Sequence, residues 1–312
     1  MDKQSKIYVA GDKTLIGAAL LRELDRQGYS NVINPENETP DLTDRTQVDD
    51  FFSKTVPEYV FFAAGMSGGI LANQKYPANL MLDNLLVECH VIDSAYRHGV
   101  KKLLYLASSC CYPKQCPQPM QVESLCSGPL EPTNEAYAMA KIAGIKLCQS
   151  YCQQYNSHFI VALPANAFGP GDDFSLENSH VIPALIRKIH QAQNLGAPSL
   201  KLWGSGSPRR EFIYADDLAN ACIFLMFHYD DPQPINVGCG MDISIKELAE
   251  KIKKVMGFQG ELLFDSSKLD GMPQKLLDSS HLNALGWQAT TSLEKALMET
   301  VKWFRQNANG SI

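Results

Sequence analysis

The chain has 312 residues, of which 45% are hydrophobic and 20% charged, and its formal net charge is −6. This composition is ordinary for a globular protein and excludes intrinsic disorder and collagen-like repeats. The negative charge and the lack of a Lys/Arg block exclude a nucleic-acid partner that is bound through a basic surface. No apolar run reaches the ~18 residues that a membrane span needs, so we expect no membrane partner.

The amino terminus and the cysteines favour a cytoplasmic location. The chain passes from Met1 through charged residues into an apolar run at Ile7, without a signal-peptide pattern. Nine cysteines, an odd number with no CxxC pair, indicate small buried apolar residues in a reducing compartment. Cys148 and Cys152 lie one helical turn apart, but no complementary His or Cys pair accompanies them, so we predict no metal site.

In the first half of the chain, short β-branched or aromatic runs alternate with longer amphipathic stretches. The pattern predicts strands at 7–10, 59–63, 102–107 and 158–163, and helices at 17–27, 77–98 and about 134–154. Such alternation predicts an α/β fold, a Rossmann-like doubly wound parallel sheet. Right-handed crossovers then place the carboxyl ends of all strands, and the ligand site, along one edge.

After Pro164 the pattern loosens into a loop rich in Gly, Pro and Asp. Helices are expected at about 181–193, 244–256 and 292–306, and we expect 216–227 and 235–238 to return to the first sheet. We therefore predict a dinucleotide-binding domain at 1–165, to which 214–240 returns. A smaller mixed α/β domain for the substrate would comprise 166–213 and 241–312.

The first turn, Gly11 to Gly17, follows a strand and opens a helix. At such a place a dinucleotide pyrophosphate meets backbone N–H groups and the positive end of the helix dipole. Rossmann enzymes of this class carry glycines at three-residue spacings, and here Thr14 occupies the middle position, where its Cβ would crowd the phosphate. A turn with only two glycines is a weak signal, and a purely structural βα turn fits it equally well.

A stronger signal is the pair Tyr137 and Lys141, four residues apart on a predicted helix and therefore on one face of it. Ser108 ends the preceding strand, which is where an open α/β sheet carries its reactive groups. A phenol with an ordinary pKa of ~10 exchanges protons near neutrality only if a cation stabilises its phenolate, and Lys141 is placed to do so. Ser108 would hold a substrate carbonyl. The alternative for the pair alone is a packed Tyr beside a solvated Lys.

Further motifs give the chain a resemblance to the extended short-chain dehydrogenase/reductase family. The general marks are PANAFGPGD at 164–172, REF at 210–212 before Asp216-Asp217, and NVG at 236–238. More specific stretches are GGI at 68–70 with AN at 72–73, YPA at 76–78, SSC at 108–110, YPK at 112–114, EPTNE at 131–135, NSHVIPA at 178–184, WGSG at 203–206, DG at 270–271 and KLLD at 275–278. The resemblance covers nearly the whole chain.

Within the family, the chain looks like the members that epimerise GDP-4-keto-6-deoxy-D-mannose at C3 and C5 and then reduce C4 with NADPH, giving GDP-L-fucose or a close 6-deoxysugar. C3 and C5 flank the C4 ketone, so enolate formation acidifies their protons, and inversion needs one group to remove a proton and another to return it. The resemblance implies Cys110 and His180 for these roles. Ser108 and Tyr137 would stabilise the C4 oxygen in both reactions. Taken singly, Cys110 fits better as a buried thiol and His180 as a helix-terminal residue, and their matches to the family motifs reverse this.

The resemblance implies NADP(H) as the cofactor, while NAD(H) stays open. Residues 34–38 follow the second strand and contain no Arg, where the family tends to have one for the 2′-phosphate, and Lys13 is the nearby base. The implied cofactor contacts are Gly11, Lys13, Thr14, Leu15, Ile16, Gly17, Asp41, Leu42, Ala63, Ala64, Gly65, Leu106, Lys141, Pro164, Asn166 and His180.

For the GDP-sugar substrate, the resemblance implies contacts with Trp203, Arg210 and Asp270, and with Lys188 where the family has Arg. The two are not equivalent at a diphosphate, because only Arg offers a planar fork to two oxygens. Lys275 matches a family Lys, although a solvated surface role is equally open. The predicted helices at 77–98 and 134–154 resemble those that pair in family dimers, so a homodimer is expected by analogy.

Two other functions stay open on the sequence. One is a GDP-4-keto-6-deoxysugar 4-reductase or 4-epimerase, in which Cys110 and His180 only line the site; hydrogen exchange with solvent at C3 and C5 separates it from the double epimerase. The other is a non-catalytic nucleotide-sugar-binding protein that has lost dinucleotide affinity through Thr14 and the missing Arg. The intact set of Ser108, Tyr137 and Lys141 argues against it.

Overall fold

A parallel sheet of six strands forms the centre of the larger lobe in the computed structural model, which describes residues 1–33, 39–175, 177–268 and 270–307. The strand order is β2-β1-β3-β4-β5-β9, and every neighbouring pair is parallel. Their bounds are β1 Ile7–Ala10, β2 Val32–Ile33, β3 Tyr59–Phe62, β4 Lys102–Leu106, β5 Phe159–Pro164 and β9 Ile235–Val237. Because the order reverses between β1 and β3, a crevice is expected at the carboxyl ends of these two strands.

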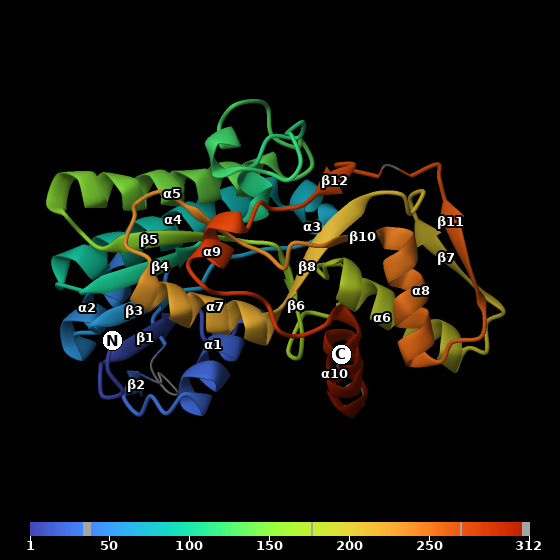
Figure 1. The fold of residues 1–312 in the computed structure, drawn as a ribbon, viewed down its shortest axis with the longest axis horizontal. Coiled ribbons are helices and arrows are strands. Elements are labelled where there is room, and N and C mark those ends of the chain that lie inside the picture. Colours follow the sequence, from blue (N-terminus) through green and yellow to red (C-terminus); the bar gives the residue numbers. More distant parts are fainter. Residues whose placement is uncertain (34–38, 176, 269, 308–312) are drawn as a thin grey trace.

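Helices cover both faces of this sheet (Figure 1). On one face α1 (Leu15–Arg26) packs against α7 (Ala215–His228), and on the other α4 (Pro77–Arg97) lies between α2 (Arg45–Thr55) and α5 (Glu135–Tyr155). All residues of β1, β4 and β5 are buried, as expected for strands that are covered on both sides. The predicted α/β doubly wound fold is therefore confirmed.

The smaller lobe has its own hydrophobic cluster, between helices and short strands at the other end of the molecule (Figure 1). Its helices are α6 (Val181–Asn194), α8 (Ile245–Met256) and α10 (Leu293–Asn307). Its strands are β6 (Asn166–Phe168), β7 (Ser199–Trp203), β8 (Arg209–Tyr214), β10 (Asp242–Ser244), β11 (Glu261–Asp265) and β12 (Gln274–Lys275). Leu277, Leu282 and Trp287 pack into the hydrophobic core of the larger lobe, although the predicted boundaries place them in the smaller domain.

Several expected features differ from the structure. The second strand, expected before residue 34, is the two-residue β2. The sequence did not predict α2 or the strands of the smaller lobe, and these strands are short or carry half-exposed polar residues instead of apolar runs. The expectation that the cysteines are buried is wrong for Cys89 and Cys126, which are exposed; all nine are free thiols. Among the described residues, no helix is both long enough and apolar enough to cross a bilayer.

A long connection between β4 and α5 is fastened to the far end of the chain through Asn236. This residue is 3% exposed on β9. Its Nδ2 donates to the carbonyls of Met120, at 2.9 Å, and Asp278, at 3.1 Å, while its Oδ1 accepts from the Tyr112 hydroxyl at 2.6 Å. Met120 also forms a parallel bridge with Leu277. One side chain on the sheet thus holds together two segments that are far apart in the sequence.

We expect Asn236→Leu to lower the free energy of unfolding by about 2–3 kcal/mol. The change leaves the buried Tyr112 hydroxyl and the Asp278 carbonyl without partners, and it removes one of the two hydrogen bonds to the Met120 carbonyl, which also accepts from the Asp278 N–H. Urea unfolding measures the loss. The control is Tyr112→Phe, which removes one hydrogen bond and should cost about 1 kcal/mol. Equal losses in the two variants would show that the two carbonyl contacts contribute nothing.

Candidate active site

The first turn lies against the end of the neighbouring strand β3. Gly11 has φ +89°, and a Cβ there would lie 2.6 Å from backbone atoms of Ala64, so only glycine allows this approach. Thr14 is the N-cap of α1: its hydroxyl donates to the Gly11 carbonyl at 2.8 Å, lies 3.2 Å from the Ala63 carbonyl, and accepts from the Gly17 N–H at 3.0 Å. The Thr14 hydroxyl therefore points toward the ends of β1 and β3, and its hydrogen bonds stabilise the turn.

This edge suits a dinucleotide. The first N–H groups of α1 have no acceptors within the helix and point out of its positive end, beside the glycine that lets β1 and β3 approach. The predicted cofactor residues Leu106, Pro164 and Asn166 lie at or just beyond the ends of β4 and β5. Lys13 is exposed in the first turn. Residues 34–38, on which the choice between NADP and NAD was argued, lie outside the described residues.

Two predicted cofactor residues, Asp41 and Leu42, lie in the loop before α2. The Asp41 carboxylate accepts hydrogen bonds from the backbone N–H and the hydroxyl of Thr43, at 2.9 and 2.7 Å, and these bonds lower the pKa of Asp41. The Leu42 carbonyl lies 3.1 Å from the His90 ring on α4. The loop is thus held in place on both sides.

The structure brings Ser108, Tyr137 and Lys141 together. Ser108 follows β4, and Tyr137 and Lys141 lie one turn apart on α5, with the Lys141 Nζ 6.0 Å from the centroid of the Tyr137 ring. Burial, and next the nearby Cys110 and Cys111, raise the pKa of Tyr137, while a hydrogen bond with Ser108 opposes the rise. Tyr137 is therefore a neutral phenol, ready to donate a proton to an oxygen that gains charge.

Cys110 lies two residues after Ser108, whose Oγ accepts from the Cys110 N–H at 3.1 Å, and its thiol has polar neighbours. Its Sγ is 3.1 Å from the Asn134 Nδ2 and 3.4 Å from the Lys275 Nζ. Lys275 is 8% exposed, so the solvated surface role that the sequence left open for it is excluded. A negative charge that forms on this sulfur would meet two hydrogen-bond donors, one of them cationic.

His180 faces the same cavity from the N-cap position of α6. The loop before it is tied to the β3–α4 connection, because the Gly69 N–H donates to the Asn178 carbonyl at 2.9 Å. Although part of His180 is exposed to solvent, the protein atoms around its ring lower its pKa; Asp173 opposes this effect and Lys275 adds to it. The imidazole is thus neutral near pH 7 and can accept a proton.

Cys110 and His180 line one cavity of about 360 Å³, a size at the low end of ligand sites. The same cavity contains the predicted residues Asn166, Lys188, Trp203, Arg210 and Asp270. A larger cavity of about 770 Å³, between β8, α8 and α10, contains none of the predicted site residues. The chemistry therefore points to the smaller cavity.

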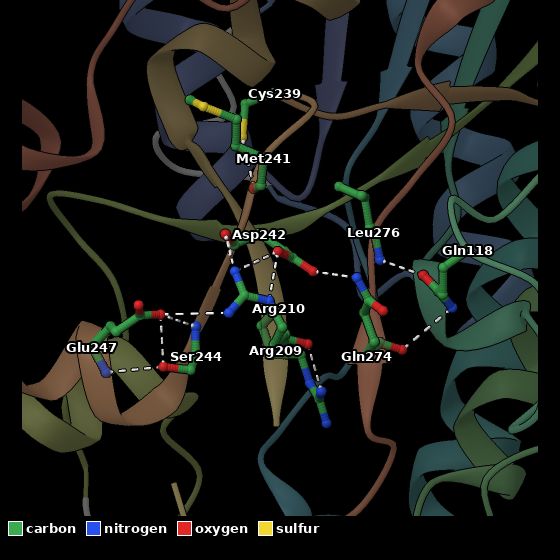
Figure 2. A network of polar contacts seen from close by, with 10 residues as sticks. All are labelled: Gln118, Arg209, Arg210, Cys239, Met241, Asp242, Ser244, Glu247, Gln274 and Leu276. Atoms are coloured by element: carbon green, nitrogen blue, oxygen red, sulfur yellow. Dashed lines mark hydrogen bonds and ion pairs between the residues drawn. The ribbon is translucent and has the colours of Figure 1, made fainter. Parts of the chain in front are cut away.

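Neighbouring arginines on β8 have different surroundings, as Figure 2 shows. Arg209 is held by Asp242, with its Nε 2.9 Å from Oδ1, and its Nη1 lies 3.5 Å from Glu247. Gln274 connects Asp242 to Gln118 in the β4–α5 connection. The Arg210 side chain instead lines the cavity, where burial lowers its pKa while Cys110, Glu131 and Asp270 oppose the fall. Arg210 is thus the arginine available to a ligand.

At the outer end of the cavity, Asp270 holds the turn that follows Trp203. Its two carboxylate oxygens accept from the Ser205 N–H at 2.8 Å and the Ser205 hydroxyl at 2.7 Å. Trp203 is 44% exposed, and the Lys268 Nζ lies 5.5 Å from its ring centroid. An exposed aromatic face beside cationic groups suits a base and a diphosphate.

These features define a dinucleotide-dependent enzyme of nucleotide sugars, and comparison with known proteins agrees. Residues 7–238 match the model of the NAD dependent epimerase/dehydratase family. The chain belongs to this family and is an enzyme of the oxidoreductase/epimerase type.

Similar proteins of known name are GDP-L-fucose synthases. A putative GDP-L-fucose synthase 2 of Arabidopsis thaliana is 50% identical over 307 residues, which cover 98% of this chain and 94% of the relative. GDP-L-fucose synthase of Escherichia coli is 45% identical over 98% of both chains.

Solved structures show the same fold. A GDP-6-OMe-4-keto-L-xylo-heptose reductase from C. jejuni has a TM-score of 0.93 at 33% identity, covering 98% of this chain and 99% of that one. A GDP-L-fucose synthetase from Naegleria fowleri bound to NADP has a TM-score of 0.91 at 30% identity, covering 100% and 97%. The NADP in this neighbour agrees with the cofactor expected from the sequence.

Sequence reasoning gave no role to two residues that contact Cys110. Asn134 lay within a quoted motif, and Lys275 was noted as the match of a family Lys with a surface role equally open, but neither was given a contact with Cys110. A third polar residue near the site, Glu88, carried no signal at all, because an acid in the middle of an amphipathic helix is ordinary. The individual roles of the predicted site residues stay predictions.

Replacing Lys275 should slow the alkylation of Cys110. The thiolate is the reactive form of cysteine, and a nearby ammonium stabilises it, so we expect Lys275→Met to reduce the rate at Cys110 about tenfold. Iodoacetamide labelling followed by peptide mass spectrometry measures each cysteine separately. Cys126, which is exposed, serves as the internal control and should keep its rate. An unchanged rate at Cys110 would show that Lys275 does not act on the sulfur.

Proposed function

We propose that this protein epimerises GDP-4-keto-6-deoxy-D-mannose at C3 and C5 and then reduces its C4 ketone with NADPH, giving GDP-L-fucose. The observation that carries this proposal is the presence of two proton-transfer groups, Cys110 and His180, in one cavity with the GDP-binding candidates, next to Ser108 and Tyr137. A simple reductase has no need of the first pair. The relatives at 45–50% identity, which are named GDP-L-fucose synthases, support it.

In the epimerisation, Cys110 and His180 would remove and return protons at C3 and C5. Both carbons are acidic because their carbanions are conjugated with the C4 ketone, and Ser108 and Tyr137 would donate hydrogen bonds to the resulting enolate oxygen. Asn134 and Lys275, which contact the Cys110 Sγ, would stabilise the negative charge on the sulfur while Cys110 holds no proton.

In the reduction, the cofactor supplies a hydride to C4. Tyr137 would give its proton to the C4 oxygen, and the Lys141 ammonium would stabilise the phenolate that remains. Ser108 would hold the same oxygen in place. Both reactions therefore use one oxygen-binding site, which explains why a single cavity serves them.

A product assay in D₂O tests the whole proposal. The protein is given GDP-4-keto-6-deoxy-D-mannose with NADPH or, in parallel, NADH, and the product is analysed by mass spectrometry. We expect reduced product with two solvent deuterium atoms, at C3 and C5, and faster turnover with NADPH.

The heptose reductase among the structural neighbours favours one second candidate, a GDP-4-keto-sugar 4-reductase without double epimerisation. Reduced product without deuterium would establish that function instead. No reduction with either cofactor would refute both functions; the non-catalytic alternative has no support, since the chain belongs to an enzyme family.

Two substitutions should separate the two reactions. Tyr137→Phe removes the proton donor for C4, so we expect reduction to fall at least ~100-fold while deuterium exchange at C3 and C5 persists. Cys110→Ser replaces a thiol with a far weaker acid, so exchange should fall by a similar factor. Reduction of a pre-epimerised substrate should then survive. Equal damage to both activities by both changes would contradict this division of labour.

The same proposal extends to assembly and location. Large apolar side chains remain exposed on α4 and α5, namely Met81, Leu82, Tyr96, Met139 and Tyr155. These adjacent helices offer a face that a second copy can cover, as expected for a homodimer with an isologous interface. Nine free cysteines fit a reducing compartment, the cytoplasm.

Leu82→Glu tests the dimer, because it places a charge on this apolar face. Leu82 is 57% exposed, so the isolated chain tolerates the change. We expect the mass measured by light scattering after gel filtration to halve, with the dimer dissociation constant at least ~tenfold higher. Leu195→Glu, at an 82% exposed residue after α6, is the matched control and should stay dimeric. A wild-type protein of monomer mass would contradict the assembly.

A further inference from the structure

A buried acid, Glu88, lies next to the Tyr137–Lys141 pair, and none of the chemistry described so far uses it. Glu88 is 1% exposed, on α4. Its Oε1 accepts from the Tyr105 hydroxyl at 2.6 Å and lies 3.2 Å from the Lys141 Nζ. The contact with Lys141 is an ion pair in which Glu88 is the carboxylate, and the Tyr105 hydroxyl donates to the same oxygen.

Each ion of this pair depends on the other. The side chains of Glu88 and Lys141 are only 2% and 5% exposed, so each buried charge needs the other as its partner. Burial raises the pKa of Glu88, while the Lys141 ammonium and the Tyr105 hydroxyl oppose the rise. An ammonium that must act on Tyr137 in a dry site is thus kept charged by this carboxylate.

The chain leaves space for the pair at Gly144, on the facing helix α5. A Cβ at Gly144 would lie 2.5 Å from the Tyr105 Oη and 2.9 Å from the Glu88 Oε2. Any larger residue would push the acid or the phenol away. The close approach of α4 and α5 at this glycine therefore fixes where the carboxylate lies relative to Lys141.

We propose that Glu88 is a positioning residue for the reduction, whose buried carboxylate keeps the Lys141 ammonium charged and in place within 6.0 Å of the Tyr137 ring. The inference rests on the proposed reduction at C4. Glu88 does not contact the reacting atoms itself; it acts through Lys141 on the proton of Tyr137.

Other titratable groups surround this set. Tyr105 faces it from β4, Cys110 and Cys111 from the 3-10 helix η1 (Ser109–Cys111), and Cys148 from α5. Burial raises the pKa of Tyr105, Cys111 and Cys148, so these three stay neutral. None of these groups changes in the variant below, so a shift in the pH profile reports Glu88.

The test is the pH profile of reduction in Glu88→Gln, which removes the charge but keeps the shape. Reduction needs protonated Tyr137, so the rate is high at low pH and is lost as the pH rises through the apparent pKa of the coupled set. Without the carboxylate, either Lys141 loses its proton earlier or its uncompensated charge favours the phenolate. Both effects move the alkaline limb to lower pH, and we expect a shift of about one pH unit or more.

A second readout needs no cofactor and no turnover. The tyrosinate absorbance of Glu88→Gln, minus that of the double variant that also carries Tyr137→Phe, gives the titration of Tyr137 alone. The same difference between wild type and Tyr137→Phe is the reference. We expect either an earlier titration of Tyr137 or, where Lys141 has lost its charge, a later one. An unchanged titration together with an unchanged alkaline limb overturns the inference.

Three further variants complete the design. Glu135→Gln removes an exposed acid from the helix that carries Lys141 and should leave the profile unchanged. Glu88→Asp keeps the charge, so its alkaline limb should stay near that of wild type even if the rate falls. Gly144→Ala, which presses on the pair, replaces Glu88→Gln if that variant does not fold and should shift the limb in the same direction. A wild-type protein without reductase activity refutes the proposed function, while the absorbance titration still decides the role of Glu88.

Discussion

The common direction of the sheet strands is the constraint on which the rest of this structure depends. Because β1, β3, β4 and β5 are all parallel, the first turn, the Ala63–Gly65 segment, Ser108 and Asn166 come from separate parts of the chain and still meet at one edge. The smaller lobe closes over that edge and supplies His180, Arg210 and Asp270. The candidate dinucleotide site and the candidate nucleotide-sugar site therefore share a border, and the proposed reacting groups lie along it.

Desolvation determines the chemistry along this border. The surrounding protein atoms raise the pKa of Tyr137 and lower that of the partly exposed His180, so both are neutral near pH 7, as the proposed proton donor and acceptor require. The two lysines nearby, Lys141 and Lys275, each have a specific partner, Glu88 and Cys110 respectively. One cation thus lies beside Tyr137 and another beside Cys110, which suits the proposed sequence of epimerisation and reduction on one substrate.

The connection between β4 and α5 and the segment at 275–278 show how distant parts complete the site. Neither is a regular element of the main sheet, yet Asn236 fastens both to it. The same attachment carries Lys275 to the sulfur of Cys110. Stability and function are coupled here, because loosening the Asn236 contacts would also displace a residue of the site.

The sequence by itself determined the fold class, the family and the Ser108, Tyr137 and Lys141 set, because strand–helix alternation and short motifs are local patterns. It also indicated Cys110, His180 and Arg210 through motifs quoted from the chain. Only the tertiary structure showed Lys275 buried beside Cys110, the Thr14 hydroxyl turned toward the strands, and Glu88 paired with Lys141. Those contacts join residues 49 to 165 positions apart, and no local pattern encodes them. Burial and partner, which set the charge of such groups, are properties of the packed chain alone.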